Sequence, residues 1–146
     1  MRSRLLVTLQ FALLAALALP WGAAGLRGWA TIPAVVSIAA GIAVGLWALG
    51  ANRAGNFNVR PEPRVGARLV TTGPYRFVRH PMYLAVLLVA AGCALGYAEP
   101  WRAVALVALA MVLHVKAAIE ERLLAGVHPG YADYARRTPR LIPFLR

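Results

Sequence analysis

The chain has 146 residues, of which 60% are hydrophobic and 14% charged, and its mean hydropathy is +0.63. This composition excludes an ordinary soluble globule and predicts a single membrane-embedded domain over residues 1–146. Sixteen Lys and Arg against five Asp and Glu give a net charge of +11. Because these basic residues lie between and beyond apolar runs, they indicate loops that face anionic lipid, and nucleic acid is not expected as a partner.

The first apolar run, residues 5–26, is interrupted only by Thr8 and Gln10. The run is long enough to cross a hydrocarbon core. We therefore expect a retained transmembrane helix, kinked at Pro20, rather than a cleaved signal peptide. Residues 27–29 then predict a short turn.

A second apolar run, residues 31–51, has the roughly 20 residues that a hydrocarbon core of about 30 Å requires. It contains Gly41 and Gly45, and a similar pair, Gly92 and Gly96, lies in the third run. Small residues four apart let two helices approach closely. Each pair therefore suits either packing within the chain or association with a second copy.

The longest polar segment, residues 52–79, separates the second and third runs. Prolines break regular structure in it, and so long a loop in so small a protein is usually functional or disordered. Residues 69–74 predict an ordered approach to the next helix. The loop carries six arginines: Arg53, Arg60, Arg64, Arg68, Arg76 and Arg79.

The third run, residues 81–98, begins with a proline, whose missing N–H suits the first turn of a helix. A tight turn at residues 99–100 leads to the fourth run, residues 101–121. Residues 126–146 form a polar tail that predicts a short helix and an extended end. The predicted fold is therefore an all-α integral membrane protein with four transmembrane helices.

The basic residues are divided unevenly between the two sides of such a bundle. One side receives the N-terminal arginines, the six of the long loop and six basic residues from Lys116 onward, whereas the other receives only Arg27 and Arg102. The positive-inside rule then puts both termini, the long loop between the second and third helices and the short tail in the cytoplasm. We expect a multi-pass protein of the plasma or inner membrane, with its site facing the cytoplasm.

Two sets of polar residues should meet at that face. The third helix starts next to Arg79, His80 and Tyr83. About 20 residues of the fourth helix, at 1.5 Å each, return the chain to Glu120 and Glu121. Helices joined by a tight turn are antiparallel neighbours, so both sets should lie at one depth. Either set alone is as readily explained by interfacial anchoring or by a solvated helix end.

Two adjacent carboxylates at the C-terminal end of a helix oppose its dipole, which is unfavourable unless a cation binds there. The pair therefore indicates a ligand cavity. His114 shares a helical face with Glu121, but a lone histidine there is more often a packed or snorkelling residue. No metal is expected, because the three histidines and Cys93 form no cluster with ligand spacing.

Four segments in this order resemble one family. They are Gly-Pro-Tyr-Arg-Phe-Val-Arg-His-Pro-Met-Tyr (73–83), Glu-Glu-Arg-Leu-Leu (120–124), Tyr-Ala-Asp-Tyr (131–134) and Arg-Leu-Ile-Pro (140–143). Together they are similar to the isoprenylcysteine carboxyl methyltransferase and phospholipid methyltransferase superfamily. The resemblance covers residues 69–143, the half expected to hold the cofactor site, whereas residues 1–50 match only in being transmembrane.

The resemblance implies transfer of a methyl group from S-adenosylmethionine to a lipophilic acceptor at the cytoplasmic membrane face, with S-adenosylhomocysteine as product. The cofactor-binding residues it implies are Tyr75, His80, Pro81, Tyr83, Glu120 and Glu121. The acceptor-binding residues that the resemblance implies are Arg79, Tyr131, Tyr134 and Arg140. Arg79 and Glu120 would act in catalysis.

These residue types suit that cofactor. A carboxylate from Glu120 or Glu121 can take its ammonium by a charge-assisted hydrogen bond. The N-terminus of the third helix, beside His80, suits its carboxylate. Tyrosines can cover the adenine or the acceptor. Because methyl transfer is an in-line displacement, it requires position more than acid–base work.

Two other functions stay open. Membrane sterol reductases carry a similar Arg-His-Pro-x-Tyr segment and use NADPH, but they usually have Asn where Met82 stands here. A non-enzymatic transporter or assembly protein is the second alternative, although transporters often place a carboxylate in mid-membrane and none is expected here. The acceptor itself, whether a carboxylate, a thiol or an amine, is not identified by these residues.

Overall fold

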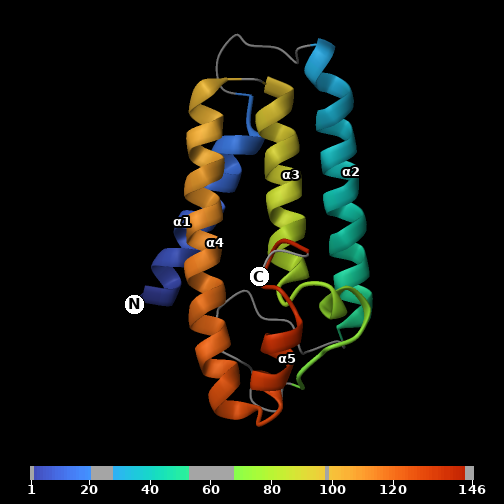
Figure 1. Cartoon of the computed structure of the whole chain (residues 1–146). Coiled ribbons are helices and arrows are strands. Elements are labelled where there is room, and N and C mark those ends of the chain that lie inside the picture. The colour runs from blue at the N-terminus through green and yellow to red at the C-terminus, as the bar shows by residue number, and fades with distance from the viewer. Residues whose placement is uncertain (1, 21–27, 53–67, 98, 144–146) are drawn as a thin grey trace.

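Four long helices stand side by side, and short segments cover one end of the bundle (Figure 1). The structure, a computed structural model, describes residues 2–20, 28–52, 68–97 and 99–143, and it contains no strand in these residues. The long helices are α1 (Arg2–Ala18), α2 (Gly28–Ala51), α3 (Pro81–Tyr97) and α4 (Pro100–Val127). A 3₁₀ turn, η1 (Gly73–Arg76), precedes α3, and a short helix, α5 (Tyr131–Arg137), follows α4. The all-α prediction is confirmed for the described residues.

Two of the helices are long and apolar enough to cross a membrane: α2, over Ala30–Ala51, and α4. The other two, α1 and α3, are apolar but have 17 residues each, which is about 26 Å of helix at 1.5 Å per residue. The helix at the second predicted span, α2, is slightly longer than predicted, because Gly28 and Trp29 belong to it rather than to a turn.

α1 ends at Ala18, inside the first predicted span of residues 5–26, for which a kink at Pro20 was predicted. Pro20 explains this end, because a proline lacks the N–H for a helical hydrogen bond and disfavours helical geometry in the residue before it. The rest of that run, residues 21–26, and most of the long loop, residues 53–67, lie outside the described residues.

The fourth predicted span is too short. α4 continues six residues past Glu121 to Val127, where the N–H of His128 bonds to the carbonyl of Leu124 at 2.8 Å. Glu120 therefore lies inside a helix rather than at its end. The effect of a helix dipole is confined to the last turn, so the dipole does not act strongly on these two carboxylates. Neighbouring charged side chains must stabilise them instead.

Glycine brings α2 and α3 into close contact. A Cβ atom on Gly41 would lie 2.8 Å from the carbonyl oxygen of Ala85, and one on Gly92 would lie 2.7 Å from that of Ala34. The hydroxyl of Ser37 adds a hydrogen bond of 2.7 Å to the carbonyl of Leu88. One glycine from each predicted pair is thus used for packing inside the chain.

Arg102 fastens the opposite end of the bundle. This side chain is fully buried and donates hydrogen bonds to the carbonyls of Leu17 and Leu19, the latter at 3.0 Å, at the end of α1. It also bonds to Glu99 at 2.7 Å. Because the last carbonyls of a helix have no partner within it, Arg102 acts as a cap that α4 supplies to α1.

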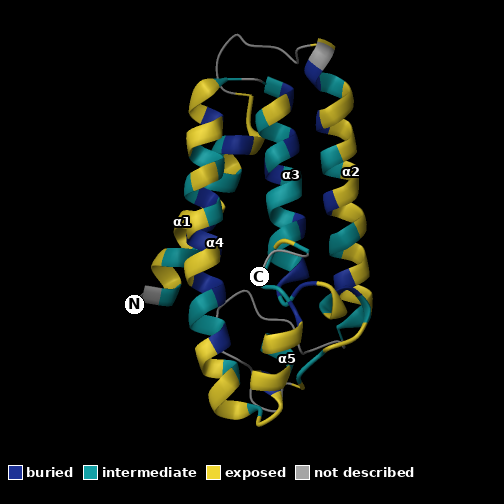
Figure 2. Cartoon of the chain, in the orientation of Figure 1, coloured by how far each residue is buried: buried dark blue, intermediate teal, exposed yellow. Residues whose placement is uncertain are grey.

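Exposed residues follow the outer faces of α2 and α4 (Figure 2). Large apolar side chains are prominent among them, including Ile32 at 76% and Leu46 at 64% exposure on α2, and Val104 at 71% on α4. Such contiguous apolar faces are unfavourable in water and indicate contact with lipid or with another protein. The polar side chains described next lie instead at the covered end of the bundle.

Candidate functional site

The approach to α3 is shaped by one glycine and one proline. Gly73 has a φ of +60°, and a Cβ atom there would lie 2.8 Å from Cβ of Ala51, so the chain turns closely past the end of α2 at this point. Pro81 then begins α3 and is itself buried. Between these two residues the chain presents Arg79 and His80 at the base of the third helix.

The two predicted sets of polar residues meet. Nε2 of His80 lies 3.1 Å from Oε1 of Glu121, and Nδ1 lies 3.6 Å from Oε2 of Glu120. The hydroxyl of Tyr83 donates to the same Glu120 oxygen at 3.0 Å. The rings of His80 and Tyr83 are stacked, with centroids 5.2 Å apart. The antiparallel α3–α4 hairpin therefore brings the residues to one depth, as its tight turn predicted.

Glu121 is the more heavily engaged carboxylate. Arg140 donates to it from Nε at 3.0 and 3.1 Å and from Nη2 at 2.7 Å. Nε of Arg79 is 3.4 Å away, and His80 completes the group. The hydrogen bonds to Glu121 raise the pKa of Arg140 above its ordinary value. Sequence reasoning assigned Arg140 to the acceptor and did not anticipate this ion pair.

The C-terminal tail is held against the start of α3. The N–H groups of Arg79 and His80 donate to the carbonyls of Pro139 and Arg140 at 2.8 and 3.1 Å. Farther back, the hydroxyl of Tyr134 in α5 donates to the carbonyl of Tyr75 at 2.6 Å. The tail is therefore an ordered wall of the site up to residue 143.

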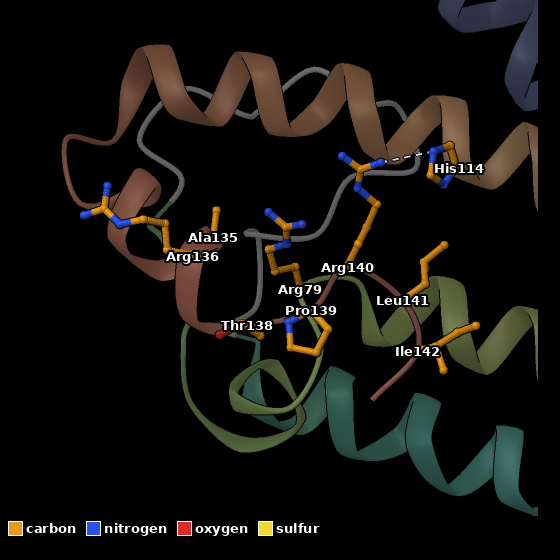
Figure 3. Close-up of a pocket in the computed structure, with 9 residues that line it drawn as sticks. All are labelled: Arg79, His114, Ala135, Arg136, Thr138, Pro139, Arg140, Leu141 and Ile142. Carbon is orange, nitrogen blue, oxygen red and sulfur yellow. Dashed lines mark hydrogen bonds between the residues drawn. The ribbon is translucent and has the colours of Figure 1, made fainter. Parts of the chain in front are cut away.

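A pocket of about 470 Å³ lies between this tail and α4 (Figure 3). Arg79 and Arg140 present their guanidinium groups in it, and Nη1 of Arg140 is 3.1 Å from Nε2 of His114. Leu141 and Ile142 supply apolar wall. The remaining lining residues are Ala135, Arg136, Thr138 and Pro139.

Two buried polar atoms at the site lack a hydrogen-bond partner in the described part of the chain: Nε of Arg79 and the hydroxyl of Tyr131. Burial, followed by the nearby charge of Glu121, raises the pKa of Tyr131. Burial, followed by Tyr131, likewise raises the pKa of Tyr134. Nε of Arg79 still faces the charge of Glu121 at 3.4 Å, whereas the hydroxyl of Tyr131 is a buried donor whose missing hydrogen bond costs free energy.

The predicted site residues therefore fall into three groups. His80, Tyr83 and the two glutamates form one cluster, which touches the pocket through Arg79 and Arg140 but does not line it. Tyr75 lies to one side, its hydroxyl 3.5 Å from the amide of Asn52 at the end of α2. Burial raises the pKa of that tyrosine. The tail tyrosines lie behind the tail wall.

His114, interpreted as a packed or snorkelling residue, is exposed and forms part of the pocket. Its spacing of seven residues from Glu121 was the available signal, because that spacing places both on one face of α4. Among the residues that the structure describes, no group of three or more His, Cys, Asp or Glu side chains could hold a metal ion.

Comparisons with known proteins find one family and two relatives for this chain. The family model for phospholipid methyltransferases matches residues 29–129. A cobalt-zinc-cadmium resistance protein, CzcN, of Cupriavidus metallidurans is 44% identical over 79 residues, which are 53% of this chain and 36% of that protein. A nickel-cobalt-cadmium resistance protein, NccN, of Alcaligenes xylosoxydans xylosoxydans is 40% identical over 84 residues, 56% of this chain and 39% of that protein. The chain thus spans well under half the length of either relative.

Proposed function

The chain belongs to the phospholipid methyltransferase family, and on this premise we propose that it transfers a methyl group from S-adenosylmethionine to a lipophilic acceptor at the cytoplasmic face of the membrane. The observation that carries the proposal is the meeting of His80 and Tyr83 with Glu120 and Glu121, next to a pocket that opens on Arg79. The family points to a membrane methyltransferase. The cluster of His80, Tyr83 and the two glutamates supplies polar groups that can bind S-adenosylmethionine.

Glu120 is the carboxylate that we assign to the cofactor's ammonium group. Glu120 accepts a hydrogen bond from Tyr83 and lies 3.6 Å from His80, whereas both oxygens of Glu121 already accept bonds from Arg140. A carboxylate that is positioned but not saturated can accept a charge-assisted hydrogen bond from a ligand. Glu121 would then hold the tail, and His80, stacked on Tyr83, would lie beside the cofactor. When bound, S-adenosylmethionine supplies an electrophilic methyl group.

The pocket is the proposed acceptor site. Arg79, whose guanidinium group lies in the pocket, would contact the polar end of the acceptor, and Leu141 and Ile142 would cover its apolar part. The chain's contribution to the reaction would be positioning and exclusion of water. These residues suit an acceptor that is polar at one end and apolar at the other.

We further propose that all four long helices cross the membrane, with both termini and the site on the cytoplasmic side. The length and hydropathy of α2 and α4 support two of these spans. The apolar character of α1 and α3, each of 17 residues, supports the other two, because short helices are accommodated by local thinning of the bilayer. The arginines at the η1–α5 end support the orientation.

The two curated relatives are named as metal-resistance proteins. We carry no metal chemistry over to this chain from those names, because the matches cover only 36% and 39% of the relatives. The chain shares only a segment with these relatives. Methyl transfer is therefore proposed for this chain from its family and from the residues of its own site.

Calorimetry with S-adenosylhomocysteine, on the whole chain in lipid nanodiscs, tests the proposal. We expect wild type to bind and Glu120→Gln to bind about tenfold or more weakly, since a hydrogen bond to a charged group contributes about 1.5–3 kcal/mol. Asp133→Asn is the matched control, because it removes an exposed carboxylate from α5 and should bind like wild type. Absence of wild-type binding, or protection from thermal unfolding by NADPH instead, would contradict the proposal.

A further inference from the structure

Lys116 is the only lysine in the chain, and its side chain is almost fully buried at 1% exposure. It lies in α4 one helical turn before Glu120, on the side toward the middle of the bundle. Taking an ammonium group out of water costs several kcal/mol unless its new partners compensate. An ionisable residue within an apolar helix therefore indicates a function when its partners form part of a site.

The first partner of Lys116 comes from α1. Its Nζ atom lies 2.5 Å from Oε1 of Gln10, which is also buried at 7% exposure. Gln10 lies within the apolar stretch of α1, where a polar side chain is costly without a partner. The family model begins at residue 29, so α1 lies outside the part of the chain that the family match explains.

The second partner of Lys116 belongs to the candidate cofactor site. The same Nζ atom lies 5.3 Å from the centroid of the Tyr83 ring, within the range of a cation–π interaction. The hydroxyl of that ring donates to Glu120 at 3.0 Å. A continuous line of contacts thus leads from Gln10 through Lys116 and Tyr83 to the carboxylate proposed for the cofactor.

We propose that Lys116 is a positioning residue for the cofactor site, held by Gln10 of α1 and acting through the Tyr83 ring on Glu120. The inference rests on the proposed function and gives α1 a part in it beyond anchoring. Gln10 fixes the ammonium group, the ammonium fixes the ring, and the ring fixes the carboxylate. Loss of either of the first two residues leaves Glu120 in place but less well oriented for a ligand.

The test measures S-adenosylhomocysteine binding by calorimetry on the full chain in nanodiscs. We expect Lys116→Met, which keeps an apolar stem, to weaken binding about tenfold. Gln10→Leu, which leaves the lysine in place, should weaken binding about fivefold. This variant provides the test if Lys116→Met does not fold. The matched control is Val115→Met, an exposed neighbour on α4, which should bind like wild type.

A double-mutant cycle separates positioning from general support of the fold. In a Tyr83→Phe background the ring stays but its bond to Glu120 is gone, so Gln10→Leu and Lys116→Met should then change affinity less than about twofold. A merely structural role predicts lower thermal midpoints with unchanged affinity. That result, or an effect undiminished by Tyr83→Phe, overturns the inference.

The single lysine offers a second readout. Protein labelled with ¹⁵N-lysine gives one side-chain amine signal, which should move on titration with S-adenosylhomocysteine along the calorimetric binding curve and should stay fixed in Glu120→Gln. If wild type binds and this signal does not move, the inference fails while the proposed function stands. If wild type does not bind at all, the proposed function fails first and the inference with it.

Discussion

Tyr131 and Tyr134 lie on the same short helix, α5, with ring centroids 6.0 Å apart, but their hydroxyls have different surroundings. Tyr134 donates to the carbonyl of Tyr75 at 2.6 Å and so ties the tail to the approach of α3. The hydroxyl of Tyr131 is buried and has no hydrogen-bond partner among the described residues. Tyr134 therefore stabilises the fold through its hydrogen bond, whereas Tyr131 leaves a buried donor without a partner among the described residues.

Replacing each tyrosine by phenylalanine should separate these roles. Tyr134→Phe loses a hydrogen bond and should lower the free energy of unfolding by about 1 kcal/mol. Tyr131→Phe removes an unpaired buried hydroxyl and should leave that free energy unchanged or raise it by up to about 1 kcal/mol. Thermal midpoints in one detergent measure both, each variant serving as the control for the other. Equal losses would contradict the assignment.

Burial also makes stability depend on pH at the alkaline end. It raises the pKa of both tyrosines above the ordinary value of 10.0. As the pH passes about 10, the unfolded chain releases these protons while the folded chain keeps them, which favours the unfolded state. Their contribution is thus complete below that pH and is lost as the pH rises. The thermal midpoint of wild type should fall above about pH 10 more steeply than that of the double phenylalanine variant.

At the scale of elements, the contact between α2 and α3 depends on where each glycine points. Gly41 faces the backbone of α3, with the carbonyl oxygen of Ala85 2.8 Å from the position of an added Cβ. Gly45, one turn later on the same helix, would place its Cβ at an ordinary 3.5 Å from that of Ala85. The two positions form a matched pair within one interface.

We predict opposite effects of alanine at these two positions. Gly41→Ala forces the helices apart and should cost about 1–3 kcal/mol of stability, as overpacking does in other cores. Gly45→Ala fits the space and improves helix propensity, so it should stabilise by up to about 1 kcal/mol. Thermal unfolding of the two variants beside wild type measures the difference. A tolerant Gly41→Ala would show that α2 and α3 are not packed as described.

The sequence predicts much of this arrangement at the level of elements. Hydropathy, proline at the start of α3 and the short connection at residues 99–100 specify an antiparallel hairpin, and helical rise then brings His80 near Glu121. The ion pair between Glu121 and Arg140 was not predicted, because Arg140 lies in a tail without a helical repeat. The contact of Gln10 with Lys116 joins residues 106 apart and is specified by tertiary packing alone.

At the scale of the whole molecule, charge is concentrated at one end. Arg79 and Arg140 pair with Glu121 at the end that carries η1 and the tail, whereas Arg102 at the other end is buried and paired with Glu99. Such asymmetry normally fixes orientation, because segments rich in Lys and Arg stay in the cytoplasm. The proposed topology therefore depends on this end of the molecule.

Reporter fusions in a bacterial host check that topology. Green fluorescent protein fused after residue 146 should fluoresce, and alkaline phosphatase fused there should be inactive, because each reporter works on only one side of the inner membrane. Fusions after Glu99, at the turn between α3 and α4, should give the reverse pattern. Matching results from the two positions would indicate an even number of crossings between that turn and the C-terminus. The four-span arrangement requires one crossing there, so only opposite results are consistent with it.

The cap that Arg102 places on α1 has a consequence for biogenesis. The carbonyl of Leu17 accepts a hydrogen bond from a side chain that the ribosome adds 85 residues later. A nascent chain that has made α1 but not the first turn of α4 therefore has an uncapped end on its first helix. α1 is synthesised first, but it can pack fully against α4 only after Arg102 has been added. Chains interrupted before Arg102 should therefore be preferred substrates for membrane quality control.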